Sequence, residues 1–387
     1  MNENFFLFRA GTVLLRLLKS PYRFLKMNIF RITLLLFCAL APFLVQSKQA
    51  GLPKHYVCYR TDTPLKIDGK ANELSWQKAR WTDDFSDILG DKGQTPRFRT
   101  RAKILWDNNF LYVFAEIREP HIWANVARRD EVIFQDNDFE VFIDPDGDTY
   151  NYYEYEMNAL NTQWDLQLSK PYRDGGIAND SWNYNGMLSA VNIEGTINNP
   201  SDTDRCWSVE IAFPMKCFRD STGVIPVKQG DQWRINFSRV EWQILIEKGH
   251  YLKKTNVRTG RPLPEDNWVW SPQKTVNMHC PEKWGYLQFS DLVAGIGITT
   301  FLPNPEEMVK DELRNLYYAQ GKYRSNHKQF AESVNKLAGV DQNLLRLNFH
   351  PAIHITPHGY EITAKLNESF RTWHINEAGR VWVERMH

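Results

Sequence analysis

Residues 134–166, FQDNDFEVFIDPDGDTYNYYEYEMNALNTQWDL, decide the fold of this chain. Two runs of alternating residues flank a connection rich in Asp and Gly, which is a strong signal for a β-hairpin. Side chains along a strand point alternately to its two faces. One face of the predicted hairpin therefore carries apolar groups: Phe139, Val141, Ile143, Tyr153, Tyr155, Met157 and Ala159.

The opposite face of the same hairpin carries most of its polar groups. Its members are Glu140, Phe142 and Asp144 in the first run and Tyr152, Glu154, Glu156 and Asn158 in the second. Because the apolar face must be buried, we expect the carboxylates and the amide to gather on an exposed outer face. That outer face is the candidate functional site.

The composition is that of an ordinary globular chain with many aromatic residues. Its 387 residues, 42% hydrophobic and 24% charged, leave room for one large domain and a smaller one. A net charge of +1 gives no electrostatic case for a nucleic-acid partner. The 14 Trp and 16 Tyr suit the core of a β-sandwich and also flat surfaces for stacking on sugars.

The N-terminus is predicted to contain an export signal at residues 27–47. A short basic start, an apolar run and small polar residues are typical of a secretory signal, and the run is too short for a comfortable membrane span. The mature chain is then expected in the periplasm or outside the cell. Residues 1–26 are either a mis-assigned start before Met27 or a real extension that makes the signal an uncleaved membrane anchor.

Removal of the signal leaves four cysteines, Cys58, Cys206, Cys217 and Cys280. An even number in an oxidising compartment permits two disulfides, with three possible pairings. Buried free thiols are the alternative. The spacing contains no Cys-x-x-Cys, so it does not indicate a zinc site.

Further short strands are predicted along the chain, at residues 102–107, 110–117, 207–213, 233–242, 268–271 and 284–289. Together with little helix and long polar loops, they predict a mainly β fold, an antiparallel β-sandwich of the jelly-roll or immunoglobulin-like kind, over residues 53–291. Residues 72–76 are expected to form a short helix with Trp76 facing inward. The loops at residues 170–185 and 248–266 are long enough to border a site.

The C-terminal segment, residues 303–387, changes character. Helical periodicity predicts two helices, Pro305–Gln320 and Tyr323–Leu337, which would form a helical hairpin. Four short alternating runs then predict a small antiparallel sheet. This segment would form a small α+β unit with an accessory or docking role.

Four motifs carry a family resemblance: IDG at residues 67–69 followed by Trp76, AKILWDNNFLYVFAEI at 102–117, DNDFEVFID at 136–144, and KWGYLQFSD at 283–291. As a set they resemble the family 9 carbohydrate-binding module, a DOMON-like β-sandwich, in its bacterial family 9-like form. The resemblance covers about residues 64–291. It implies a sandwich that binds sugars, is often attached to enzymes that degrade polysaccharides, and holds structural calcium in some members.

The resemblance also implies roles for individual residues. Family members that bind sugar clamp one ring between two Trp side chains beside a carboxylate. Glu140 matches that carboxylate, and Phe134 and Met278 stand at the two stacking positions. Glu156 stands where the family has an Arg that contacts sugar hydroxyls.

The residues themselves favour the same kind of ligand. Sugar sites pair an aromatic plane with carboxylates and amides, and here Glu140, Glu156 and Asn158 would supply the polar groups. The plane would come from Phe134, Trp164 or Trp182, with the pair Met278-His279 in a neighbouring loop. The alternative is a solvated polar face with internal salt bridges.

Asp144, Asp146 and Asp148 in the predicted turn indicate a structural calcium site. Closely spaced carboxylates around a glycine suit a hard cation that prefers oxygen ligands. Asp and Gly are also the commonest residues of tight turns, so a plain turn is the alternative.

Catalytic and haem-binding functions are the competing interpretations. A glycoside hydrolase would need two carboxylates with separated pKa values across a cleft, and a sandwich face gives little desolvation to raise either one. DOMON relatives include haem modules, for which Met157 or the Met278-His279 pair would have to supply axial ligands.

The sequence therefore predicts an exported β-sandwich that binds a plant-type or other polysaccharide or oligosaccharide without hydrolysing it. Its partners would be glycoside hydrolases or other exported proteins. The alternatives are a hydrolase acting on O-glycosyl compounds and a surface scaffold without a sugar ligand.

Overall fold

The computed structural model describes residues 53–220, 223–337, 350–365 and 371–384. The predicted signal at residues 27–47 and the extension before it lie outside this part of the chain. Within the described residues, no helix combines the length and the apolar character needed to cross a membrane.

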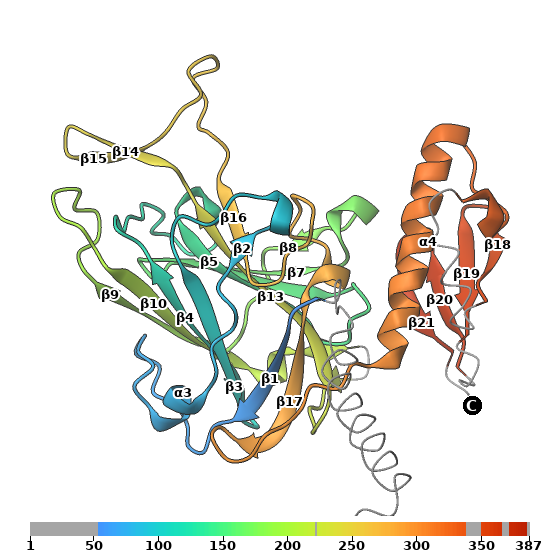
Figure 1. Ribbon diagram of the computed structural model, residues 1–387, viewed down its shortest axis with the longest axis horizontal. Coiled ribbons are helices and arrows are strands. Elements are labelled where there is room, and N and C mark those ends of the chain that lie inside the picture. Colours follow the sequence, from blue (N-terminus) through green and yellow to red (C-terminus); the bar gives the residue numbers. More distant parts are fainter. Residues whose placement is uncertain (1–52, 221–222, 338–349, 366–370, 385–387) are drawn as a thin grey trace, which may run out of the picture. The chain divides into compact units, whose positions relative to one another are not determined.

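A large β-sandwich is built from one continuous path of strands, β8-β7-β6-β5-β13-β17-β1-β3-β4-β10-β9 (Figure 1). Two further strands, β16 and β2, extend from β13. The sandwich strands are β1 (His55–Arg60), β2 (Ser86–Asp87), β3 (Thr100–Trp106), β4 (Phe110–Arg118), β5 (Asp138–Asp144), β6 (Tyr152–Asn158), β7 (Gln163–Leu168), β8 (Ala178–Asn179), β9 (Leu188–Glu194), β10 (Cys206–Pro214), β13 (Gln232–Glu241), β16 (Asp266–Val269) and β17 (Gly285–Val293).

One apolar core joins the two halves of this path. The predicted inward faces of β5 and β6 pack against β10 from the far half, and the rings of Tyr155 and Phe213 lie 5.4 Å apart. The antiparallel prediction holds for the sandwich pairs except at β1, which runs parallel to both β17 and β3. The sheet is therefore mixed, and the sandwich fold is confirmed.

The short helix α3 (Leu74–Lys78) forms where the sequence predicted it. Trp76 is fully buried, and its Nε1 donates to Glu210 Oε1 at 2.8 Å. The other oxygen of Glu210 accepts the backbone N–H groups of Asp68 and Gly69. Burial raises the pKa of Glu210 to about 7. The IDG motif and Trp76 are thus joined through one buried carboxyl group.

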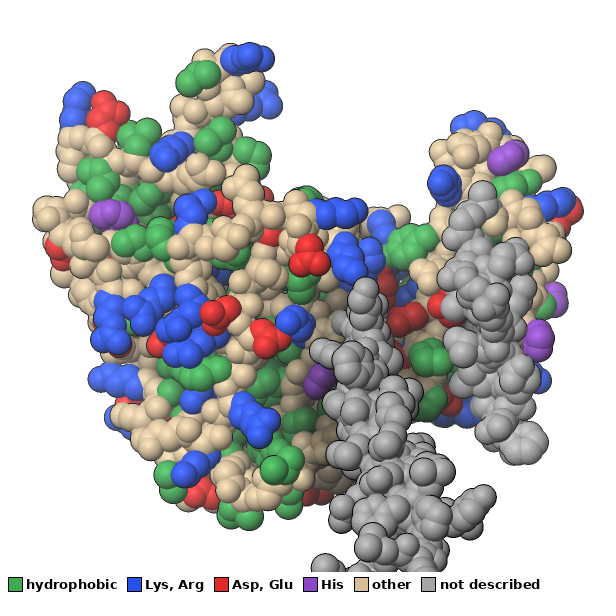
Figure 2. All heavy atoms as spheres, viewed as in Figure 1, with side chains coloured by type: hydrophobic (Ala, Val, Ile, Leu, Met, Phe, Trp, Pro, Cys, Tyr) green, Lys and Arg blue, Asp and Glu red, His purple; other side chains and the backbone are tan. Residues whose placement is uncertain are grey.

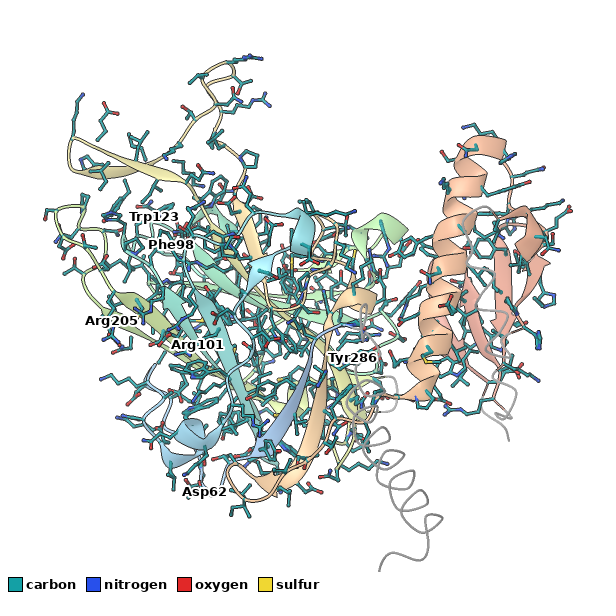
Figure 3. All side chains as sticks on the ribbon, in the orientation of Figure 1. Asp62, Phe98, Arg101, Trp123, Arg205 and Tyr286 are labelled. Carbon is teal, nitrogen blue, oxygen red and sulfur yellow. The ribbon has the colours of Figure 1, made fainter. Side chains whose placement is uncertain are left out.

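The outward face of β3, β4 and β10 carries a group of basic side chains (Figure 2), including Arg101 and Arg205, which are labelled in Figure 3. Arg101 lies 3.1 Å from Glu116, and Arg205 lies 2.7 Å from Glu194. Much of the positive charge is therefore neutralised within the sheet itself.

Several short elements complete the described part up to residue 293. They are the strands β11 (Arg219–Asp220), β12 (Gly223–Val224), β14 (Ile244–Glu247) and β15 (His250–Lys253), and the 3₁₀ helices η1 (Gly90–Lys92), η2 (Ile133–Gln135), η3 (Tyr172–Asp174), η4 (Met215–Cys217) and η5 (Pro281–Lys283). All four cysteines of the sandwich are free thiols in this structure.

The predicted C-terminal helical hairpin is wrong. One helix, α4 (Pro305–His327), continues through Gly321, and among the described residues the only helical element after it is the three-residue η6 (Val334–Lys336). The helix ends at Lys328 in a left-handed conformation. The side chain of Gln320 then bonds both the N–H and the C=O of Ala331, which turns the chain back along the helix.

The predicted small antiparallel sheet is present after α4. Its strands pair in chain order, and Tyr360, Ile362 and Ile375 pack against Leu313 of α4 in a second apolar core. The strands are β18 (Ala352–Ile355), β19 (Tyr360–Ala364), β20 (Trp373–Asn376) and β21 (Val381–Val383).

An ion pair and a hydrogen bond connect α4 to the β5 end of the sandwich. Arg234 of β13 contacts Glu307 at 2.8 Å, and Arg314 donates to the carbonyl oxygen of Gly147 at 2.9 Å. Burial alone would raise the pKa of Glu307, but Arg234 and Lys310 lower it to about 2.

Candidate functional site

The hairpin that opened the sequence analysis folds as β5 and β6 in the predicted register. Glu140 pairs directly with Glu156, and Asp138 pairs with Asn158. Glu154 follows on the same face of β6, opposite Phe142. The prediction that these polar groups share one face is confirmed.

The prediction that this face is exposed is wrong. Glu140 is 4% exposed and Glu156 is 2% exposed. The same face also carries Phe142 and Tyr152, which form an apolar cluster with Trp284. Because those rings must also leave water, loops cover the face and the neighbouring carboxyl groups are buried with them.

Asn158 holds backbone segments next to β5 and β6, and its predicted contact with a ligand stays a prediction. Its Oδ1 accepts the backbone N–H groups of Leu160 and Thr162, and its Nδ2 donates to the carbonyl of Val126 and to Asp136. The amide is fully buried, and all these bonds hold the turn after β6 and the loop before β5. This side chain has little capacity left for a sugar hydroxyl.

Four buried carboxyl groups form the central acidic cluster: Asp138, Glu140, Glu154 and Glu156. Burial raises the pKa of Glu140 to about 7, with a smaller contribution in the same direction from Glu265. Burial raises the pKa values of the other three well above their usual range, and charge repulsion within the cluster adds to this. Near neutral pH the cluster therefore holds protons, and a neutral carboxyl group can both donate and accept hydrogen bonds.

Several oxygens of the central acidic cluster have no partner among the described residues. They are Asp138 Oδ2, Glu140 Oε2 and Glu154 Oε2. Glu156 Oε2 accepts the backbone N–H of Phe134 at 3.1 Å. Buried polar atoms are nearly always bonded, so these orphan oxygens need an explanation.

Phe134 and Trp164 form an aromatic shelf beside the cluster. Both are partly exposed, and their rings lie 6.4 Å apart at 32°. Trp164 pairs with Glu156 across β6 and β7, and Phe134 lies on η2. The structure therefore brings both predicted aromatic residues to Glu156.

Met278 and His279 lie on the same face, farther toward the turn. Met278 packs in the cluster of Phe142 and Trp284, and Trp284 Nε1 donates to its carbonyl at 2.9 Å. His279 Nδ1 lies 3.0 Å from the hydroxyl of Tyr152. Burial, assisted by Arg173, lowers the pKa of His279 to about 4, so this ring is neutral.

Tyr172 also lies at the site, although the sequence pattern did not predict it there. It is 47% exposed, lies on η3, and its ring is 4.5 Å from that of His279. Burial raises its pKa, and the charges of Glu154 and Glu156 raise it further. Its position in the predicted border loop at residues 170–185 was the available signal.

Trp182 does not join the site. It packs on the core side of β6, with its ring 4.9 Å from Tyr153 and 4.4 Å from Tyr184. The sequence placed it in the correct loop but could not show which face of the hairpin it covers.

Asp144, Asp146 and Asp148 come together in the turn after β5, with one carboxylate oxygen of each within 4.8 Å of the others. The turn itself already uses several of their oxygens. Asp144 accepts the N–H groups of Gly147 and Thr149, both at 3.0 Å, and Asp148 accepts that of Tyr150. Calcium at this turn cluster of Asp144, Asp146 and Asp148 stays a prediction.

A hollow of about 280 Å³ lies against the hairpin of β14 and β15, and Phe134 packs in the same apolar cluster as Trp123, one of the residues that line the hollow. Its walls include Trp123, Tyr251 and Lys253; Trp123 is labelled in Figure 3. A hollow of this size could hold one sugar ring.

Comparison with known proteins identifies the domain that carries this site. Residues 67–227 match the family described as carbohydrate family 9 binding domain-like. In sequence, 163 residues are 28% identical to endo-1,4-beta-xylanase A of Thermoanaerobacterium saccharolyticum, covering 42% of this chain and 12% of that protein. In a second comparison, 131 residues are 30% identical to exoglucanase XynX of Acetivibrio thermocellus, covering 34% of this chain and 10% of that protein.

The chain thus spans about a tenth of the length of the curated relatives it matches. Among solved structures it is similar to a family 9 carbohydrate-binding module of Caldicellulosiruptor kristjanssonii, solved with cellotriose and with glucose. Each comparison gives 15% identity and a TM-score of 0.37, and covers 100% of that module and 64% or 65% of this chain. The chain contains a carbohydrate-binding module of the family 9-like type, which the family match places at residues 67–227.

Proposed function

We propose that this module binds a polysaccharide or oligosaccharide chain without hydrolysing it, at the aromatic shelf of Phe134 and Trp164. The observation that carries the proposal is the position of this shelf. Trp164 pairs with Glu156 across the sheet, and the backbone N–H of Phe134 donates to Glu156. The partly exposed Tyr172, from another loop, is close enough for the charges of Glu154 and Glu156 to raise its pKa. A sugar ring would lie on the shelf with its hydroxyls toward the cluster.

The protonated carboxyl groups support binding rather than hydrolysis. A retaining or inverting hydrolase needs one ionised carboxylate beside one acid. Here burial and mutual repulsion raise the pKa values of all four members together. Neutral carboxyl groups fit the mixed donors and acceptors of sugar hydroxyls.

The relatives supply the biological setting of the proposal. They are a xylanase and an exoglucanase, which favours plant-type β-linked glycans as ligands. We infer that the chain is exported to the periplasm or the medium and supports polysaccharide breakdown beside such enzymes. The C-terminal unit of α4 and its sheet would serve as an accessory or docking element.

Isothermal titration calorimetry with glucose, cellotriose and xylotriose tests the proposal. Binding should weaken in Phe134→Ala and Trp164→Ala and stay unchanged in Tyr251→Ala, which alters the neighbouring hollow. Weakening only in Tyr251→Ala would move the site to that hollow. Release of reducing sugar that is lost in Glu140→Gln would instead favour the hydrolase alternative. The absence of a binding signal for all three sugars in the unmodified chain would favour a scaffold without a sugar ligand.

A further inference from the structure

The central acidic cluster lacks the positive partner that two other buried acids of the sandwich, Glu119 and Glu241, share. Glu119 and Glu241 are equally buried, but Arg239 contacts both, at 2.6 and 2.7 Å. No ion pair within the described residues joins a member of the central acidic cluster to Lys, Arg or His. Arg239 thus neutralises that pair of buried carboxylates, whereas the central acidic cluster has no counterpart of Arg239 among the described residues.

The geometry of the cluster fits a single cation. One oxygen from each of Asp138, Glu140 and Glu156 lies within 4.8 Å of the other two. Oxygens that bind the same Ca²⁺ at about 2.3–2.6 Å can be at most about 5 Å apart. All three residues project from the paired strands β5 and β6, so the backbone register holds the separation.

The orphan oxygens are a second, independent indication of a ligand. Glu154, which lies outside this group of three, is 5% exposed and leaves Oε2 without a partner. Asp138 Oδ2 and Glu140 Oε2 also lack a hydrogen-bond partner. The other oxygen of Asp138, Oδ1, accepts the N–H of Val240. A buried ionised carboxyl group is costly unless it is paired or coordinates a metal.

We propose that Asp138, Glu140 and Glu156 bind one divalent cation at the centre of β5 and β6, and that this cation is calcium. The available donors are all oxygens, which suit hard cations. Calcium accepts irregular geometry and can take further oxygens from Glu154, whereas magnesium demands a near-ideal octahedron. The proposal goes beyond sugar binding, because it can be measured with no sugar present.

The alternative occupant of the cluster is protons. Protons and a cation compete for the same carboxylate oxygens, so the cation should bind more tightly as the pH rises. A cluster that holds only protons and a cluster that binds a cation can be distinguished by measurement, since only the cation-binding cluster takes up metal.

The test titrates the metal-free full chain with CaCl₂ by calorimetry at pH 7.5, in parallel with Tb³⁺ luminescence excited through tryptophan. We expect one site whose affinity falls by at least about tenfold in Glu140→Gln/Glu156→Gln. The matched control is Asp146→Asn/Asp148→Asn, which alters the turn cluster and should keep that site. Gln has the shape of a protonated Glu, so the first variant should stay folded, as circular dichroism would show.

Trp164→Phe locates the site without touching a carboxyl group. Tb³⁺ emission should fall by at least about half in this variant while Ca²⁺ affinity is kept, because Trp164 pairs with Glu156. The proposal is overturned by an absence of Ca²⁺ uptake at millimolar concentration, or by uptake lost only in the turn variant. Unchanged Tb³⁺ emission in Trp164→Phe would also count against it.

Discussion

Two groups of acidic residues lie on the same hairpin, and they differ in how their oxygens are used. In the turn cluster, Asp144 accepts two backbone N–H groups of its own turn, and Asp146 is exposed. In the central acidic cluster, Glu140 and Glu154 are buried, and each leaves an oxygen unpartnered. Similar residue types thus serve local structure in one place and leave bonding capacity for a ligand in the other.

The largest expected effect is on the free energy of unfolding, which should respond differently to substitutions in the turn cluster and in the central acidic cluster. Asp144→Ala should lower the free energy of unfolding by about 2–4 kcal/mol, because the N–H groups of Gly147 and Thr149 lose their acceptors in a buried turn. Glu154→Gln should change it by less than about 1 kcal/mol at pH 7.5, since Gln resembles the protonated acid. Urea denaturation measures both. Equal losses of unfolding free energy in the two variants would show that the two clusters contribute to stability in the same way.

The second prediction concerns pH. The pKa of Glu140 is raised in the folded chain to about 7, so the folded state binds more protons than the unfolded state between about pH 4.5 and 7. Its contribution to stability is therefore complete below the ordinary Glu pKa and is lost as the pH rises through about 7. Over this interval we expect a loss of about 1–3 kcal/mol.

Glu140→Gln should flatten this pH dependence. Asp146→Asn, at the exposed edge of the turn cluster, should retain it. Stability measured by urea denaturation from pH 4.5 to 8 provides the comparison, and a curve that is identical in Glu140→Gln and in the unmodified chain would contradict the assignment to Glu140.

The third prediction concerns metal. Calcium at about a hundred times its Kd should stabilise the chain by at most about 2.7 kcal/mol. The shift in Tm should be larger at pH 8 than at pH 5.5, because protons compete for the central acidic cluster. Differential scanning calorimetry with calcium and with EDTA measures it. A shift that persists in Glu140→Gln/Glu156→Gln would assign the calcium effect to the turn cluster.

The smallest expected effect is on sugar affinity. Phe134→Ala removes one stacking plane beside Glu156, which should cost about 0.5–1.5 kcal/mol of binding free energy. Asp146→Asn in the turn cluster should leave affinity unchanged. Calorimetric titration with cellotriose compares the two, and equal affinities for both variants would place the ligand away from the aromatic shelf.

Short-range pattern was enough for much of the fold. Alternation predicted β5, β6 and β10 and placed Glu140 and Glu156 on the same face of the hairpin. It failed for the C-terminal helical hairpin, because the helix end at Lys328 depends on a left-handed residue and on the side-chain bonds of Gln320 to Ala331. Periodicity carries no signal for such bonds.

The site was predicted only in part. Phe134, Trp164, Glu140 and Glu156 converge, while Trp182 packs on the opposite side of β6. Loop residues have no fixed period relative to a strand, so their face cannot be derived from spacing. Tyr172 was missed for the same reason.

The sequence by itself determined that the acids of β5 and β6 share one face, because a period of two leaves no other arrangement once the opposite face is apolar. Only the tertiary structure decided that this face is buried. Trp284 and Met278, more than a hundred residues away in the chain, pack on Phe142 and close the face from solvent. Burial depends on what covers a strand, and that covering comes from distant segments of the chain.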